Sequence, residues 1–213
     1  MNTIIEFSKN NWLEIAGVVF SVIYLYFSIN RKLWLWAVGI ISSAIYVVVF
    51  FRASLYADMI QNIYYVIISI YGLITWIKDR DNLDKRTYEV EVYKTPLKKI
   101  APIILAWLSI HATIYCFTKF MPEILGISSA SIPLIDSCLT STAFIATWML
   151  AKKYIEQWVL WIFVDFAYIV VYAYRELYLT CFLFLIYTSM AIVGYVKWKE
   201  HLLTDNKNKI KQL

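Results

Sequence analysis

The chain has 213 residues, of which 61% are hydrophobic and 16% are charged, and its mean hydropathy is +0.62. Soluble domains average about 45–50% apolar and about 25% charged residues. This composition therefore excludes a soluble globular protein and predicts an integral membrane protein.

Seven apolar segments follow one another along the chain, at residues 13–30, 33–51, 55–77, 100–120, 135–151, 157–174 and 177–198. A helix of about 20 residues crosses the hydrocarbon layer of a bilayer. Open strands are excluded there because lipid offers no hydrogen-bond partner to their backbone groups. The sequence thus predicts an all-α protein with seven transmembrane helices. Tryptophans near the segment ends, at positions 36, 76, 158 and 198 among others, are expected to anchor at headgroup depth.

The whole chain, residues 1–213, is predicted to be a single membrane domain. Two polar stretches lie outside its apolar segments. Residues 78–99 are mixed in charge and predict a cytoplasmic linker between the third and fourth spans. Residues 199–213 predict a cytoplasmic tail that is disordered, because it is mostly polar. Residues 100–120 are then expected to form a helix that connects the first three spans to the last three.

The basic residues fall on alternate sides of the predicted membrane in very unequal numbers. One side carries 4 of the 20 lysines and arginines, and the side with the linker and tail carries 16. Basic residues are retained in cytoplasmic loops, so the split predicts an outside N-terminus and a cytoplasmic C-terminus. The net charge of +5 thereby reports orientation, and no nucleic-acid partner is expected.

The chain also contains an internal repeat. A shift of 122 residues aligns 36–76 with 158–198 without a gap and gives 11 identities in 41 positions. Three of these are Trp36 with Trp158, Gly72 with Gly194 and Trp76 with Trp198. Residues 13–77 and 135–198 are then two three-helix copies. Because one span separates them, both insert in the same direction, in a 3+1+3 parallel arrangement. Transporters are built from such repeats, with the substrate site near the midplane between the copies.

Polar side chains within the spans are candidates for substrate binding, because they are costly in lipid. In the sixth span, Trp158, Trp161 and Asp165 share one helix face. A carboxylate beside two indole rings suits a flat cationic ligand. Trp158 has a simpler interpretation as an interface anchor. Asp165 lies about seven residues into the span, too deep for an anchor, and is expected to be a pore or site residue.

The third and fifth spans supply further candidates. Asp58, Gln61 and Tyr65 share a face of the third span, with Asn62 and Ser69 beside it, while Asp58 could instead complement the helix dipole. Thr140 belongs to a polar strip in the fifth span that begins at Asp136, whose role is expected to be dipole complementation or lining of an outer vestibule. Catalytic and metal-binding motifs are absent from the sequence, so no enzyme activity, metal or cofactor is expected.

At these residues the sequence resembles the PnuC family of bacterial vitamin transporters over nearly its whole length. The resemblance is carried by Leu55-Tyr56 with Tyr71-Gly72, by Asp136-Ser137, by the run KKYIEQWVLW at 152–161, and by Leu177-Tyr178 with Gly194 and Trp198. It implies a multi-pass protein of the bacterial inner membrane that takes up nicotinamide riboside, or in relatives thiamine, by facilitated diffusion. It also implies a site lined by Trp158 and Trp161, and trapping of the vitamin by a cytoplasmic kinase. A homo-oligomer is compatible with the resemblance.

Three polar positions depart from the nicotinamide riboside pattern of that family. Asp165 stands where asparagine is usual, Asn62 where glutamine is usual, and Ser69 where asparagine can occur. An added carboxylate favours a ligand with an amino group or a permanent positive charge, such as thiamine. Nicotinamide riboside remains the first expectation and thiamine the second. A seven-helix receptor or subunit without transport is the alternative from another class.

Overall fold

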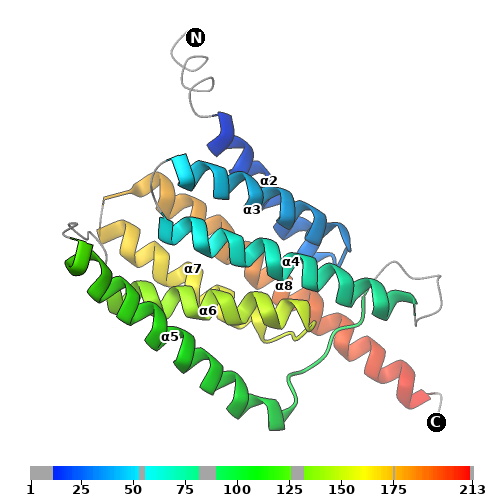
Figure 1. The fold of residues 1–213 in the computed structure, drawn as a ribbon. Helices are drawn as coiled ribbons and strands as arrows, with labels where there is room; N and C mark the ends of the chain where they lie inside the picture. The colour runs from blue at the N-terminus through cyan, green and yellow to red at the C-terminus, as the bar shows by residue number, and fades with distance from the viewer. Residues whose placement is uncertain (1–11, 53–55, 82–89, 126–131, 175, 212–213) are drawn as a thin grey trace. The chain divides into compact units, whose positions relative to one another are not determined.

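The computed structural model describes residues 12–52, 56–81, 90–125, 132–174 and 176–211, and these residues form seven helices (Figure 1). The helices are α2 (Trp12–Ile29), α3 (Trp34–Arg52), α4 (Tyr56–Asp81), α5 (Leu97–Leu125), α6 (Pro133–Ala151), α7 (Gln157–Tyr174) and α8 (Tyr178–Lys211). Each predicted apolar segment corresponds to one helix, which confirms the all-α prediction.

Six of the helices contain apolar stretches long enough to cross a membrane. These are Trp34–Arg52, Asp58–Asp79, Leu97–Phe120, Pro133–Ala151, Gln157–Tyr174 and Thr180–Thr204. In α2 the apolar stretch is the shorter Val18–Ile29. Large apolar side chains such as Ile67, Phe166 and Phe182 are more than half exposed, as expected where lipid rather than protein covers a helix.

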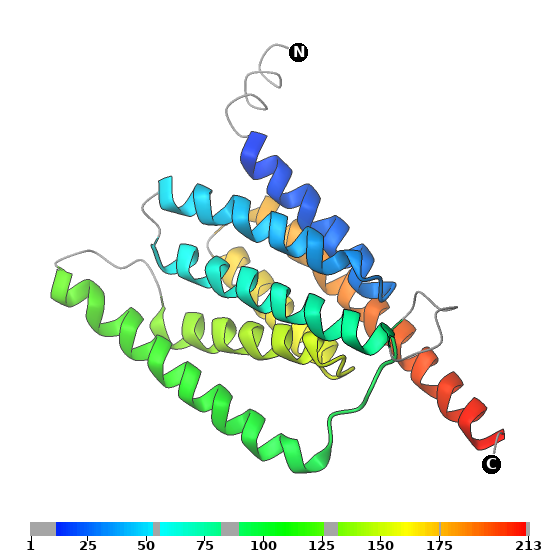
Figure 2. The ribbon, with the colours of Figure 1, turned by 45° about the vertical axis from the view of Figure 1, so that its right-hand side comes forward.

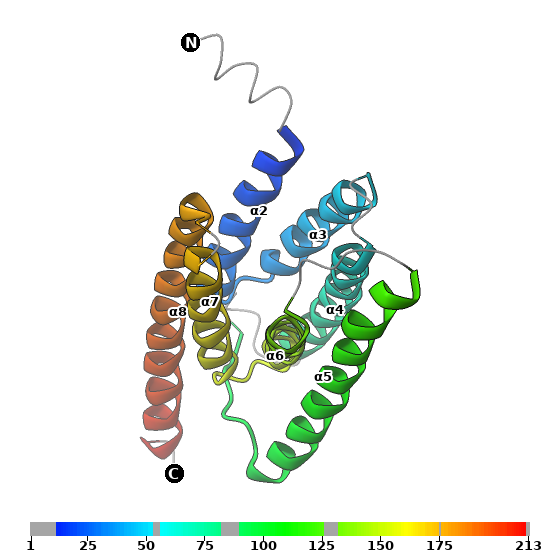
Figure 3. The ribbon, with the colours of Figure 1, turned by 90° about the vertical axis from the view of Figure 1, so that its left-hand side faces the viewer.

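The chain divides into two units, Met1–Glu91 and Val92–Leu213. In the first unit α3 packs against both α2 and α4, which Figure 2 shows from a second direction. In the second unit α5 packs on α6, α6 on α7 and α7 on α8, and the close pairing of α7 with α8 is clearest in Figure 3.

The turn after α2 and the turn after α6 are built alike. The N–H groups of Arg31 and Lys32 donate to the carbonyls of Ser28 and Phe27 at 3.1 and 2.9 Å. The N–H groups of Lys153 and Tyr154 donate to Leu150 and Met149, both at 2.9 Å. This is the Schellman arrangement, in which the residue after the helix is left-handed, and Arg31 and Lys153 have φ of 53° and 62°. The two turns occupy equivalent places in the 122-residue register.

The end of the predicted linker is attached to the turn between α6 and α7. Tyr93 pairs with Tyr154 in a short parallel bridge, donating to the Lys153 carbonyl and accepting from the Ile155 N–H, each at 3.0 Å. The Glu156 carboxylate accepts from the N–H and the hydroxyl of Thr95 at 3.0 and 2.7 Å. These contacts hold the start of α7 in place.

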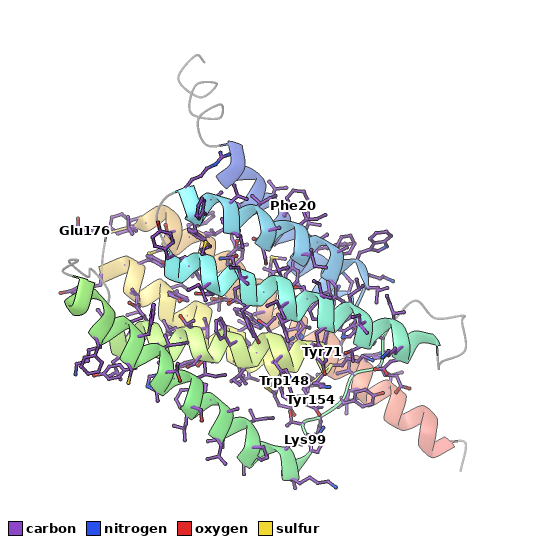
Figure 4. The ribbon with its side chains drawn as sticks, viewed as in Figure 1. Phe20, Tyr71, Lys99, Trp148, Tyr154 and Glu176 are labelled. Carbon is purple, nitrogen blue, oxygen red and sulfur yellow. The ribbon has the colours of Figure 1, made fainter. Side chains whose placement is uncertain are left out.

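A lysine and two aromatic rings complete this attachment. The Lys99 ammonium donates to the Tyr154 hydroxyl at 3.1 Å, and the ring of Trp148 meets that of Tyr154 edge to face at 6.2 Å. Figure 4 shows Lys99, Trp148 and Tyr154 gathered at one end of the second unit.

The prediction of a disordered tail is wrong for residues 199–211. Helix α8 continues through them to Lys211, so the helix extends well beyond its apolar stretch. Polar residues such as lysine, asparagine and glutamate can extend a helix that has already formed, because adding a residue to a helix costs far less than nucleating the helix. Residues 212–213, and residues 82–89 of the predicted linker, lie outside the described residues.

Candidate functional site

Trp158 is wedged between two residues of α8. It is 1% exposed, and its ring meets that of the fully buried Trp198 edge to face at 5.7 Å. A Cβ placed on Gly194 would lie 2.6 Å from Trp158 Cζ2. The indole Nε1 is buried, with no hydrogen-bond partner in the described part of the chain. Trp158 therefore packs α7 against α8.

The same arrangement occurs in the first unit at the equivalent positions. Trp36 and Trp76 are fully buried and meet edge to face at 5.4 Å. A Cβ on Gly72 would lie 2.4 Å from two atoms of the Trp36 ring. The expectation that these four tryptophans anchor in the lipid headgroups is therefore wrong, because protein encloses all four rings. Trp34, at 69% exposed, is free to take that role.

Trp161 and Asp165 lie one turn apart on α7. Trp161 is half-buried and Asp165 is 6% exposed. Placing an aspartate at the centre of a membrane helix costs about 2.5–3.5 kcal/mol on insertion scales. Within the described residues the Asp165 carboxylate has no hydrogen bond or ion pair to offset that cost. An unpaired buried carboxylate one turn from an indole ring is equipped to receive a cation.

The polar strip on α6 is mostly occupied with its own helix. The hydroxyls of Ser137, Ser141 and Thr142 donate to backbone carbonyls three or four residues earlier, at 2.7–3.1 Å. Asp136 lies in the first turn and accepts from the Ile132 N–H at 3.0 Å, as a residue that complements the helix start does. Thr140 is the half-buried member of the strip whose hydroxyl makes no hydrogen bond to the described chain.

The candidates on α4 form local pairs in the first unit. Gln61 Nε2 donates to the Tyr65 hydroxyl at 3.1 Å, and Asn62 Nδ2 donates to the Asp58 carbonyl at 2.9 Å. The side chain of Asp58 is exposed in the first turn of the helix. The Asn62 bond uses its donor group and leaves a carbonyl oxygen on the helix surface.

Ser69, farther along α4, is 3% exposed and faces α3. Its Oγ would lie 3.1 Å from a Cβ placed on Gly39, whose other close neighbour is the Tyr24 ring at 3.0 Å. Ser69 thus belongs to the contact between α3 and α4, and its use by a substrate stays a prediction.

Gln157 is a candidate that the sequence did not single out. It is fully buried at the first position of α7, and neither Nε2 nor Oε1 has a hydrogen-bond partner in the described residues. Its polarity was unremarkable beside Lys152, Lys153 and Glu156. The available signal was its partner in the repeat, Leu35, which is also fully buried.

Comparison with known proteins places the chain among bacterial transporters. A sequence profile of the family described as nicotinamide mononucleotide transporter matches residues 11–200. The nicotinamide riboside transporter PnuC of Escherichia coli is 22% identical over 210 residues, covering 88% of this chain and 85% of that protein. The protein of the same name from Neisseria mucosa is 25% identical over 199 residues, covering 90% and 73%.

A solved structure has a similar fold. The crystal structure described as that of the vitamin B3 transporter PnuC aligns with a TM-score of 0.69 at 21% sequence identity. The alignment covers 95% of this chain and 87% of that one. At this identity the likeness concerns the arrangement of the helices.

Proposed function

The chain belongs to the nicotinamide mononucleotide transporter family as a multi-pass protein of the bacterial inner membrane, and we propose that it takes up a flat cationic vitamin by facilitated diffusion. The first candidate is nicotinamide riboside, the substrate named for the two PnuC relatives. The observation that carries the proposal is the buried, unpaired carboxylate of Asp165 one turn from Trp161. Nicotinamide riboside has a flat pyridinium ring with a permanent positive charge. The charge can pair with the Asp165 carboxylate, and the flat ring can stack on the Trp161 indole.

The proposed orientation places the N-terminus outside and the C-terminus in the cytoplasm, with α2–α4 and α6–α8 as parallel repeats joined by α5. The uneven distribution of basic residues supports the orientation. The matching turns at Arg31 and Lys153, and the two Trp–Gly–Trp contacts in one register, support the repeat. In this topology α2 is a seventh span.

Net uptake by facilitated diffusion needs a sink for the substrate. We propose that a cytoplasmic kinase phosphorylates the vitamin, because the added negative charge prevents its return through a site built for a cation. This functional partner, and any association of the chain with copies of itself, are open to test by co-expression and by mass determination in detergent.

Thiamine is the second candidate substrate. Asp165 favours it because thiamine combines a permanently charged thiazolium ring with an aminopyrimidine, and a carboxylate attracts the first and accepts from the second. The proposed contacts for either vitamin come from both copies of the repeat. They are Trp158, Trp161 and Thr140 in the second copy, and Asp58, Gln61, Asn62, Tyr65 and Ser69 in the first.

Uptake into proteoliposomes tests the proposal. Vesicles with the purified protein are expected to take up radiolabelled nicotinamide riboside, or thiamine, faster than protein-free vesicles. If neither vitamin enters faster and neither binds in calorimetry, transport is refuted and the non-transporting receptor or subunit becomes the better interpretation.

The role of Asp165 is tested separately by Asp165→Asn. Removing the charge is expected to weaken binding of the cation tenfold or more, where tenfold is about 1.4 kcal/mol. Asp136→Asn is the matched control, since that carboxylate is occupied at a helix start and its loss should leave affinity within about threefold. Equal affinities for the wild type and Asp165→Asn would remove Asp165 from the site.

A further inference from the structure

The amide of Gln157 is the most completely enclosed polar group on α7. The residue is 0% exposed, yet both amide atoms lack a partner in the described part of the chain. An unpaired buried donor or acceptor costs about 1–3 kcal/mol. A group retained at that cost is a candidate for a hydrogen bond with a bound molecule.

Packing does not require an amide at this position. Leu35, 122 residues earlier, also precedes a tryptophan wedged on a glycine, and is also 0% exposed. Leucine and glutamine have similar volumes, so leucine fills the equivalent place in the first unit without an unpaired polar group. The difference between the two copies is therefore chemical.

Three of the differences between α3 and α7 lie along one side of the helix. Gln157, Trp161 and Asp165 are spaced at i, i+4 and i+8, which places them along one side of the helix. The residues at the same places on α3 are Leu35, Gly39 and Ser43.

Two neighbouring positions are identical in the two helices, Trp36 with Trp158 and Ile40 with Ile162. Gln157 thus lies on the same side of α7 as the two proposed site residues, at the end where Lys152 and Lys153 precede the helix.

We propose that Gln157 is a further specificity-determining residue, whose amide makes a paired hydrogen bond with the transported molecule. This inference rests on the proposed transport function. A primary amide offers one donor and one acceptor side by side. The complementary edge is a carboxamide, as on nicotinamide riboside, or an aminopyrimidine, as on thiamine. Trp161 and Asp165 then bind the charged ring, and Gln157 selects rings that carry a donor–acceptor edge.

The test pairs Gln157→Leu with ligands that have or lack this edge. Nicotinamide riboside is compared with ribosylpyridinium, which keeps the charged ring and the ribose but has no carboxamide. If thiamine is the ligand that binds, it is compared with 3-benzyl-5-(2-hydroxyethyl)-4-methylthiazolium, which keeps the charged thiazolium ring but has a phenyl group in place of the aminopyrimidine. Affinities come from calorimetry in detergent, and the midpoint of thermal unfolding is measured without ligand.

Gln157→Leu is expected to bind the complete vitamin at least tenfold more weakly and to bind the edge-deficient ligand within about twofold of the wild type. The unliganded variant should unfold at or above the wild-type temperature, because a leucine already fills the equivalent place in the first unit. Leu35→Met is the control at that place and should change neither affinity. Gln157→Met replaces Gln157→Leu if the latter does not fold.

Two outcomes would overturn the inference. If Gln157→Leu binds the complete vitamin as tightly as the wild type, the amide serves another partner such as an ordered water. If both ligands weaken equally, the variant acts through the shape of the site. Failure of the wild type to bind either vitamin would instead refute the proposed function, so the two failures are distinguishable.

Discussion

Replacing Gly194 by alanine should destabilise the protein even though alanine is the better helix former. Three atoms of the Trp158 ring lie 2.6–2.7 Å from the position of the added Cβ, closer than the 3.0 Å below which real Cβ contacts essentially never occur. The ring has no room to retreat, because it is 1% exposed and Trp198 stands against it. Overpacking of this kind costs about 1–3 kcal/mol, whereas the helix gains about 1 kcal/mol from alanine. The expected net loss is up to about 2 kcal/mol.

The three glycines at helix contacts form a graded series for this reasoning. Gly72→Ala should lose the most stability, since its Cβ would meet two Trp36 atoms at 2.4 Å. Gly194→Ala should follow. Gly39→Ala should lose least, because its nearest atoms are at 3.0 and 3.1 Å and belong to the Tyr24 ring and the Ser69 hydroxyl.

Thermal unfolding of the ligand-free protein in one detergent, followed by intrinsic tryptophan fluorescence, measures the order. Trp158 and Trp36 are themselves reporters of the two contacts. Equal stabilisation of all three variants, as helix propensity alone predicts, would refute the packing argument, and so would the greatest loss at Gly39.

Three further predictions concern single side chains. Trp158→Phe and Trp36→Phe should lose similar stability by thermal unfolding, but only Trp158→Phe should weaken vitamin binding in calorimetry; equal affinities would leave Trp158 a packing residue. Thr95→Ala and Glu156→Gln should be non-additive in a double-mutant cycle of unfolding free energies, with a coupling of about 1.5–3 kcal/mol for a charged hydrogen bond, and additivity would contradict the contact at 2.7 Å. Glu176→Gly should raise the unfolding temperature, since Glu176 is exposed with φ of 61° and a left-handed residue other than glycine costs about 1 kcal/mol; Glu176→Ala is the control and should not.

The helices could be predicted from the sequence because lipid leaves the backbone no alternative. An apolar run of sufficient length is a helix wherever it crosses the bilayer, so the seven predicted segments and the observed helices differ mainly at their ends. The longest discrepancy is in α8, which continues to Lys211. Apolarity marks where lipid ends, and a helix that leaves the lipid continues until its local sequence stops it.

The tertiary roles of individual residues were harder to predict. Trp158 near a span start has the same signature whether it anchors at an interface or packs on a glycine, and the decision depends on Gly194, which is 36 residues away. The attachment of Tyr93 and Thr95 to the turn after α6 uses backbone groups and one carboxylate, which leave no periodic pattern. In the sequence, Gln157 is one polar residue beside several charged ones, and only the fold shows that it is buried.

The internal repeat of the sequence combines matching packing residues with differing polar residues. The tryptophans and glycines that pack the second helix of each copy against the third are the same, which fits a constraint of close packing that tolerates little change. The polar residues differ. On the second helix, Gln157 and Asp165 of the later copy stand where the earlier copy has Leu35 and Ser43.

On the third helix, three polar side chains of the first copy have apolar counterparts in the second. Gln61, Asn62 and Ser69 of the first copy correspond to Leu183, Phe184 and Ala191 of the second. The candidate amide and carboxylate groups therefore lie on a different helix in each copy, while the packing of tryptophan on glycine is the same. A symmetric pair of sites would present the same groups twice, whereas a flat vitamin has different chemistry at its charged ring and its hydrogen-bonding edge. Because the copies have diverged at these positions, the groups that we propose for the ring and for the edge need not be alike.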